Sequence, residues 1–297
     1  MLTYSVVERR FLGAIDLLSI NADHIQGSEV TVFSFSPQGD YVVINNEANH
    51  FRITDSWSAS SRFYAFADRE GGRVTIYDRV AGTKNTVEFG QGQVKRILVS
   101  DYGDVVLDAH TIYRLAKSNG YSLEKLGISG DALGISGLDL VYFSEEAIQK
   151  VNIISGSNEF LQKMPGDVQL RQVNKGQAVF TVKDGTVSVV YNLSSGNLYE
   201  YKYTYDSFPG LQGWSFSPDS KHCVVHSGDS YLVTDERGQQ ERIRTADNNM
   251  SSIDGGWIDN NTFVTVFIRD NHNFKAGNFH ICAYDLSTKQ RLILYEQ

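Results

Sequence analysis

Two histidines, His222 and His226, are the first residues whose spacing could do chemistry. Four residues apart on a helix, they would offer two imidazoles to one metal ion. The apolar run around them predicts a strand instead, in which residues at this spacing lie about 13 Å apart. We therefore expect ordinary strand residues here and no bound metal.

Two other strings resemble a catalytic and a phosphate-binding motif. Gly213-Trp-Ser215-Phe-Ser217 lacks the second glycine of a nucleophile elbow, and no helical pattern follows it. The glycine-rich stretch from Gly127 to Gly137 lacks the Lys-Ser/Thr pair of a phosphate-binding loop and predicts a flexible link between two repeated units. Neither string predicts a catalytic residue, and no cofactor is expected.

The composition is that of a folded, strand-rich protein. Apolar residues make up 41% of the chain and aromatic residues 12%, and aromatic side chains favour pleated, half-buried surfaces. The net charge of −8 opposes binding to a nucleic-acid backbone or to an anionic membrane surface. We expect neither of these partners, whereas a neutral or basic protein is easier to accommodate.

Cysteine usage and the N-terminal segment bear on the compartment. Cys223 and Cys282 lack the spacing of a disulfide framework or a zinc module, so both are expected to be buried free thiols. The first residues are polar and carry no small-residue cleavage site, and no run reaches the roughly 18 apolar residues of a membrane span. The sequence thus predicts a cytoplasmic protein.

A unit of strand, glycine turn and strand recurs along the chain. Its copies lie about 40 residues apart, and the last interval is longer. Some of the turn glycines are expected to have positive φ, which glycine adopts at no steric cost. The turn positions are Gly82, Gly120, Gly156, Gly196, Gly238 and Lys289, where lysine replaces the glycine.

A second marker occurs at another phase of the unit and reads strand, turn, strand. Its clearest copies are Phe33-Ser-Phe-Ser36-Pro-Gln-Gly-Asp40 and Trp214-Ser-Phe-Ser217-Pro-Asp-Ser-Lys221. Proline at the first corner presets φ near −65°, which favours chain reversal between two apolar runs. Residues 99–104 and 256–262 are degenerate copies.

These two markers resemble those of the WD-repeat and related bacterial β-propellers, whose blades carry an FSPDG turn and a Tyr/Trp-Asp corner. The corner reads Tyr77-Asp78, Tyr191-Asn192 and Tyr284-Asp285 in this chain. The resemblance implies an all-β fold, a single β-propeller domain over residues 1–297 with four-stranded antiparallel blades. Seven blades are preferred and six are the alternative.

The repeat positions also predict the limits of each blade. The expected blades are residues 1–50, 51–91, 92–128, 129–165, 166–206, 207–249 and 250–297. The first unit, about residues 1–50, is the least regular. In it, Phe11, Ala14, Ile15 and Leu18 have helical spacing, and a short helix is an alternative there.

The candidate partner-binding residues come from two segments. Residues 269–278 exceed the length that a tight hairpin needs, and they supply Arg269, Asp270, His272, Phe274 and Lys275. Tyr205 and Phe208 end an aromatic stripe of period two and pass into a turn, where an aromatic side chain can anchor a partner.

Several classes of function remain open. The lack of a local catalytic motif favours a non-enzymatic interaction module or scaffold that binds another protein. The acidic charge also suits a bacterial immunity or antitoxin protein that caps a toxin. A propeller enzyme of the lactonase or lyase type would use inner-strand carboxylates in a central channel, with Asp55, Asp101, Asp254 and Asp259 as candidates. A carbohydrate-binding propeller is weakened because tryptophan occupies only two equivalent positions, 214 and 257.

Overall fold

The regular secondary structure of the computed structural model is almost entirely β-strand. It describes residues 2–5, 10–14, 32–35, 42–45, 53–68, 72–174, 176–182, 187–201, 214–227, 230–244, 250–269 and 279–296. Among these residues the only helix is the short 3-10 turn η1 (Lys117–Asn119), so no described helix has the length and apolar character needed to span a bilayer.

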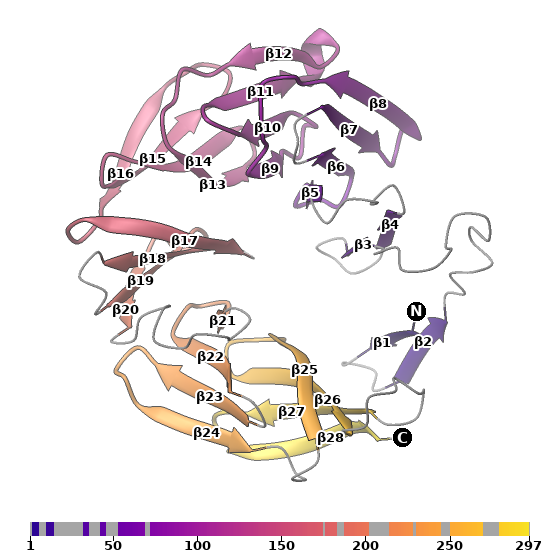
Figure 1. The fold of residues 1–297 in the computed structure, drawn as a ribbon, viewed down its shortest axis with the longest axis vertical. Helices are drawn as coiled ribbons and strands as arrows, with labels where there is room; N and C mark the ends of the chain where they lie inside the picture. The colour runs from indigo at the N-terminus through magenta and orange to yellow at the C-terminus, as the bar shows by residue number, and fades with distance from the viewer. Residues whose placement is uncertain are drawn as a thin grey trace. The chain divides into compact units, whose positions relative to one another are not determined.

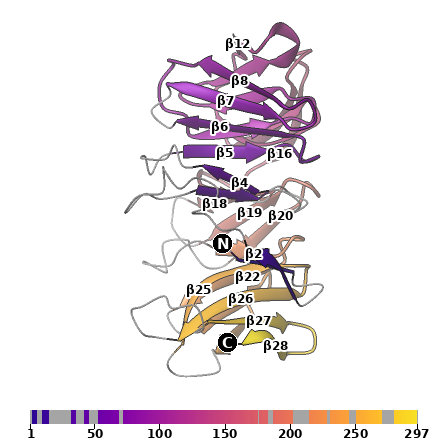
Figure 2. The same ribbon diagram turned by 90° about the vertical axis from the view of Figure 1, so that its right-hand side faces the viewer.

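Six sheets of the described part of the chain have four strands each, and within each sheet every strand pairs antiparallel with the next one in the chain. Figure 1 shows this order, and Figure 2 shows β5 to β8 side by side. The first three sheets are β5 (Ile53–Trp57), β6 (Phe63–Asp68), β7 (Arg73–Asp78) and β8 (Thr83–Glu88); β9 (Arg96–Val99), β10 (Val105–Asp108), β11 (Ile112–Ala116) and β12 (Ser122–Lys125); and β13 (Asp131–Ser136), β14 (Asp139–Ser144), β15 (Ala147–Asn152) and β16 (Asn158–Lys163).

The other three sheets follow the same plan. They are β17 (Val168–Asn174), β18 (Gln177–Val182), β19 (Ser188–Asn192) and β20 (Leu198–Tyr201); β21 (Trp214–Phe216), β22 (His222–Ser227), β23 (Ser230–Asp235) and β24 (Gln240–Arg244); and β25 (Met250–Trp257), β26 (Thr262–Arg269), β27 (Phe279–Asp285) and β28 (Gln290–Glu296). All six sheets lie inside the ranges that the repeat predicted for single blades, so those limits are confirmed.

The N-terminal fifty residues contain four short strands that pair two by two. β1 (Leu2–Ser5) pairs with β2 (Arg10–Ala14), and β3 (Val32–Phe35) pairs with β4 (Val42–Asn45). Phe11 and Ala14 lie in β2, so the helical alternative is wrong for this strand. Its helical spacing is overridden because the ladder with β1 satisfies the main-chain groups.

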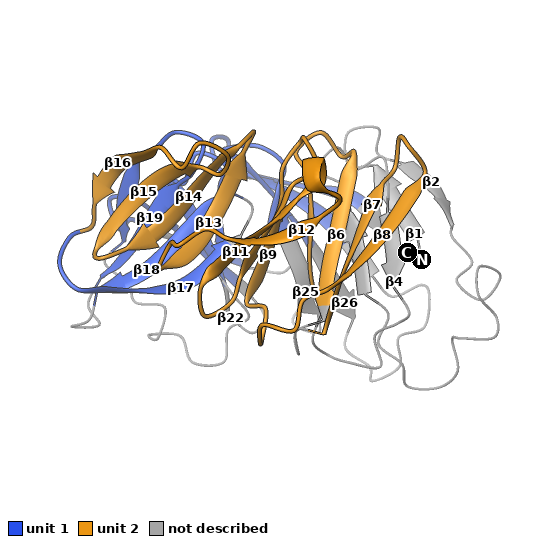
Figure 3. Ribbon diagram, turned by 90° about the horizontal axis from the view of Figure 1, so that it is seen from above, with its two compact units in different colours: residues 1–15, 165–297 blue, residues 16–164 orange. Residues whose placement is uncertain are grey.

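The chain divides into two compact units (Figure 3). One comprises residues 16–164, here called unit 2, and the other comprises residues 1–15 and 165–297, here called unit 1.

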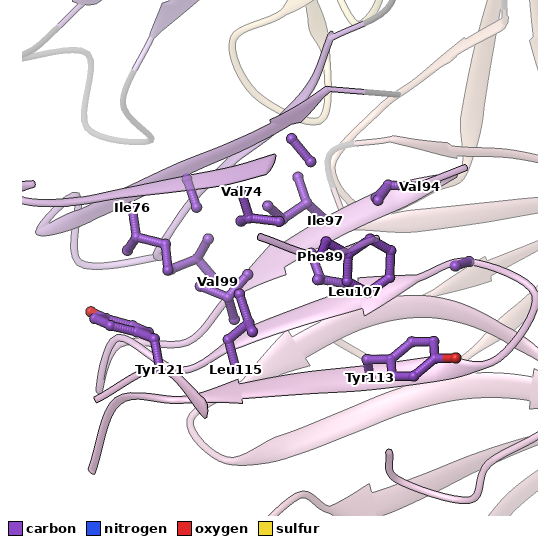
Figure 4. Packing of buried hydrophobic residues seen from close by; sticks show 14 of the residues in the cluster. Val74, Ile76, Phe89, Val94, Ile97, Val99, Leu107, Tyr113, Leu115 and Tyr121 are labelled. Carbon is purple, nitrogen blue, oxygen red and sulfur yellow. The ribbon is translucent and has the colours of Figure 1, made fainter. Parts of the chain in front are cut away.

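In unit 2, consecutive sheets pack face to face through apolar side chains. The sheets β5–β8 and β9–β12 share a core in which Val74 and Ile76 pack with Ile97, Val99 and Leu107 (Figure 4). A second cluster joins β9–β12 to β13–β16. The middle strands β10 and β11 are therefore covered on both faces and buried throughout, which explains their nearly continuous apolar sequences. The edge strand β8 is polar and mostly exposed.

Unit 1 repeats this packing. Tyr201 of β20 lies against Phe216 and Cys223 of the following sheet, and Phe263 and Cys282 pack against Val224 and Tyr231. Both cysteines are buried free thiols, as predicted. Tyr199 and Tyr201 confirm that the aromatic stripe is a packing surface at its start, and its later part lies outside the described residues.

The glycine-rich stretch is only partly a link. Residues 127–130 connect β12 to β13, as expected, but Asp131–Ser136 form β13 itself. Ala132 and Leu133 are apolar and buried, which favours a strand here. The number of glycines in the stretch hid this strand from the sequence analysis.

Candidate functional site

The turn between the first and second strands of a sheet is built on a buried serine at three places. The hydroxyl oxygens of Ser58, Ser100 and Ser217 each accept a hydrogen bond of 3.0 Å from a main-chain N–H at the start of the next strand or one residue before it. The fourth residue of each turn has positive φ: 59° at Ser61, 91° at Gly103 and 62° at Ser220. The turn marker is confirmed at 100 and 217, whereas the copy at 58 was missed because it contains neither proline nor glycine.

The turn between the third and fourth strands is closed by an Asp or Asn, as the corner marker predicted. In five sheets the side-chain Oδ1 accepts two main-chain N–H groups at 2.7–3.1 Å, which ends the third strand. These residues are Asp78, Asn152, Asn192, Asp235 and Asp285.

The turn glycines have the expected backbone conformation. Positive φ is confirmed at all five turn glycines, with values of 65°, 64°, 72°, 71° and 78° at Gly82, Gly120, Gly156, Gly196 and Gly238. Lys289 takes the same conformation with a φ of 57°, which a side chain rarely adopts.

Asp78 also links two sheets of unit 2. Arg62 holds it bidentately, with Nε–Oδ1 at 3.0 Å and Nη2–Oδ2 at 2.8 Å, and Lys117 of the next sheet donates from Nζ to Oδ2 at 3.2 Å. The hydrogen bond from Arg62 is the main reason why the pKa of this carboxyl lies well below its usual range. Both cations also lie over the ring of Phe63, at 4.8 and 4.2 Å from its centre.

Arg114 links the sheet β9–β12 to the next one. Its guanidinium donates to Asp104 Oδ1 at 3.1 Å, to Glu124 Oε2 at 3.3 Å and to the main-chain oxygen of Ile153 at 3.2 Å. Asp104 Oδ1 also accepts the main-chain N–H of Lys117 at 2.9 Å. These charges are therefore engaged within the protein and hold neighbouring turns together.

A third charged group lies at the opposite end of the same sheets. Arg96 donates from Nε to Asp108 Oδ2 and from Nη2 to Asp131 Oδ1, both at 3.1 Å, and the N–H of Ala132 also donates to Asp108. Burial raises the pKa of Asp108, and its Oδ1 has no hydrogen-bond partner among the described residues. With Lys95 3.6 Å from Asp131, the carboxylates and cations balance, which favours a link between sheets over a cation site.

Unit 1 uses neutral groups for the same purpose. The side-chain amide of Gln177 donates to the main-chain oxygen of Ser217 at 2.6 Å, and that of Asn192 donates to the main-chain oxygen of Pro218 at 2.8 Å. The hydroxyl of Tyr201 donates to the Ser220 oxygen at 2.6 Å. Burial is the main reason why the pKa of Tyr201 is raised. The serine turn of one sheet is thus bound by the preceding sheet.

The contacts of Asp78 and Arg114 hold together the turns at one end of unit 2. In an antiparallel meander, the first and third turns lie at the same end of the sheet. We call this end of unit 2 the turn face; it comprises residues 58–62, 79–82, 100–104, 117–121, 137–138 and 153–157. Neighbouring turns are joined there: Ser60 N–H donates to Asp101 Oδ1 at 2.7 Å, and the ring of Tyr102 lies near Gly137.

Three large apolar side chains point from the turn face into solvent. Val80, Tyr102 and Ile154 are 68%, 62% and 59% exposed. The sequence reasoning missed them, although a signal exists. Val80 and Ile154 lie two residues after the corner Asp or Asn, a position held by Ser194, Arg237 and Ser287 in unit 1.

The binding residues predicted from sequence cannot be placed beside this face. Asp270, His272, Phe274, Lys275, Tyr205 and Phe208 lie outside the described residues, and only the main chain of Arg269 is described, at the end of β26. β20 and β26 both end at the opposite end of their sheets from the first and third turns.

Two of the four candidate channel carboxylates serve turns. Asp101 accepts the N–H of Ser60, and Asp259 accepts those of Asn261 and Thr262, which lowers its pKa. Asp55 lies on β5, and the side chain of Asp254 is outside the described set. His222 and His226 both lie on strand β22, as expected, and the described residues contain no cluster of metal ligands.

Six successive four-stranded meanders with these turns are the blades of a β-propeller, and the protein has this fold, of the WD-repeat-like kind that its sequence markers resemble. No protein-family model and no curated protein matches the chain.

Kluyveromyces lactis Hsv2, the Dos1 propeller and virginiamycin B lyase are among the solved structures that are similar to it. Kluyveromyces lactis Hsv2 is 15% identical, with a TM-score of 0.45 over 79% of this chain and 84% of that chain. The Dos1 propeller is 12% identical, with a TM-score of 0.47 over 82% and 70%. Virginiamycin B lyase from Staphylococcus aureus is 13% identical, with a TM-score of 0.41 over 84% and 89%. None of these similarities assigns an activity, and the fold rests on the chain's own sheets.

Proposed function

We propose that this protein is a non-enzymatic β-propeller that binds another protein and acts as an interaction module. The observation that carries the proposal is the exposure of Val80, Tyr102 and Ile154 on the turn face. Large apolar side chains exposed on the same face of a protein are typical of interaction sites, and tyrosine is among the residues that most often anchor them.

The scaffold beneath these side chains supports the same proposal. The turns that carry them are fixed by Asp78, Asp104 and Arg114, so little conformational entropy is lost when a partner binds. Loops held by a rigid framework are where binding residues concentrate. A cytoplasmic location agrees with the two free thiols, which persist in a reducing compartment.

The test compares two exposed aromatic residues. Wild type, Tyr102→Ser and Phe160→Ser are used as bait in an extract of the native host, and bound proteins are quantified by mass spectrometry. Phe160 is the matched control, because it is 64% exposed but lies on the edge strand β16. We expect a specific protein to be recovered with wild type and Phe160→Ser and lost with Tyr102→Ser, while thermal melts remain unchanged. Equal recovery with all three baits, or no specific partner for any, would refute the proposal.

A further inference from the structure

The turn face carries exposed positive charge on a protein whose overall charge is −8. Arg62 and Lys117 have side chains 41% and 36% exposed, and Arg79 is exposed beside them, with Nε donating to the Ser61 oxygen at 3.1 Å. The third sheet adds no charged residue to this face.

Two of the three carboxylates of this region are turned inward. Asp78 and Asp104 are 4% and 5% exposed, whereas Asp101 is half-buried and its Oδ1 accepts the Ser60 N–H. Asp78 Oδ1 accepts Arg62 and the N–H groups of Val80 and Ala81, while its Oδ2 accepts Arg62 and Lys117. These acceptors are therefore occupied by the protein itself.

Arg62 and Lys117 have N–H donors that Asp78 does not use. A guanidinium has five N–H donors and an ammonium has three, and Arg62 gives two of its donors to Asp78 while Lys117 gives one. Because Asp78 is buried between them, it fixes both side chains, and their exposed fractions of 41% and 36% keep part of each cation in contact with solvent. A carboxylate brought by a partner would meet preorganised charged donors, which make the stronger class of hydrogen bond.

We infer that the turn face of unit 2 binds an acidic segment of a partner protein, whose carboxylates meet Arg62, Arg79 and Lys117 and whose apolar side chains cover Tyr102 and Val80. This inference rests on the proposed function and names the chemistry of its partner. A nucleic acid is a less favoured occupant, because the exposed apolar side chains would find no match on a phosphate backbone.

Synthetic peptides provide the probe. Fluorescently labelled peptides that combine Asp or Glu with Leu and Trp are compared by anisotropy with three matched sets: Lys replacing the acids, Asn and Gln replacing the acids, and Ser replacing the apolar residues. We expect binding by the acidic apolar set alone. We also expect weaker binding when NaCl rises from about 0.1 M to about 1 M, which shortens the screening length from about 10 Å to about 3 Å.

Two substitutions locate the effect. Arg79→Glu should weaken binding about threefold to tenfold, since it replaces an attraction by a repulsion at a partly solvated site. Arg237→Glu changes the net charge equally in an exposed third turn of unit 1 and should leave binding unchanged. If Arg79→Glu lowers the melting temperature, Lys117→Gln, which keeps the stem over Phe63, takes its place.

The outcomes separate this inference from the proposed function. Equal binding of basic or neutral peptides, no binding by any set, or equal losses with Arg79→Glu and Arg237→Glu would overturn the acidic partner. Preference for duplex DNA or phosphatidylserine vesicles over the acidic peptides would do the same. A partner that is captured through Tyr102 but is insensitive to salt and to Arg79→Glu would leave the proposed function standing and remove the inference alone.

Discussion

Substitution of Asp78 separates the two tasks that this residue performs. Asp78→Asn retains an Oδ1 acceptor for the N–H groups of Val80 and Ala81, as Asn152 and Asn192 do at equivalent corners. It removes the charge that holds Arg62 and Lys117. Because both cations are partly exposed and can be rehydrated, the expected loss in unfolding free energy is only about 1–2 kcal/mol.

Asp78→Ala also removes the turn acceptor. Two main-chain N–H groups then lose their partner at about 1 kcal/mol each, so the expected total loss is about 3–4 kcal/mol. The assay is guanidinium unfolding followed by tryptophan fluorescence, since Trp57 lies in the same sheet. Asp285→Asn is the control, because Asp285 makes the same corner but belongs to no ion pair among the described residues; it should lose much less than Asp78→Asn.

The pH dependence gives an independent check. The pKa of Asp78 is lowered in the folded state, chiefly by Arg62, so its stabilising contribution is complete above about pH 4 and is lost as the pH falls through the folded-state value. The difference between wild type and Asp78→Asn should therefore shrink in acid. Equal losses for Asp78→Asn and Asp285→Asn, or no added loss for Asp78→Ala, would refute this account of the corner.

Three further substitutions test other parts of the fold by the same unfolding assay. Lys289→Gly should stabilise the protein by roughly 0.5–1 kcal/mol, because relief of the positive φ exceeds the loss of the exposed ion pair with Glu241; destabilisation would contradict the turn assignment. Tyr201→Phe should cost about 1–2 kcal/mol, since the buried Ser220 oxygen loses its donor, and an unchanged stability would show that this link contributes nothing. Burial raises the pKa of Asp108, so the contribution of this residue to the unfolding free energy is largest below about pH 4 and falls as the pH rises through the folded-state pKa. Asp108→Asn should remove this pH-dependent contribution. An unfolding free energy that depends on pH in the same way in wild type and Asp108→Asn would argue against it.

The sequence by itself determined the repeated sheet and its limits. Turn geometry is a local property, because it depends on a few adjacent residues. Gly82 adopts positive φ, and the corner Asp or Asn accepts main-chain N–H groups two to four residues after it. Alternation of apolar runs with these turns therefore located all six four-stranded sheets. For residues 10–14 the helical spacing of Phe11 and Ala14 left a short helix as an alternative, and pairing with the adjacent strand β1 decided against it.

The candidate site depended on tertiary structure. Tyr102 and Val80 lie 22 residues apart in turns of different types, and nothing local shows that one face presents both. Charge composition says as little about the site, because the net charge of −8 describes the whole molecule and cannot tell which carboxylates are buried. Only the folded chain brings Asp78 into contact with both Arg62 and Lys117. An ion pair between two sheets forms when packing brings distant strands together, and burial decides which charges remain in contact with solvent.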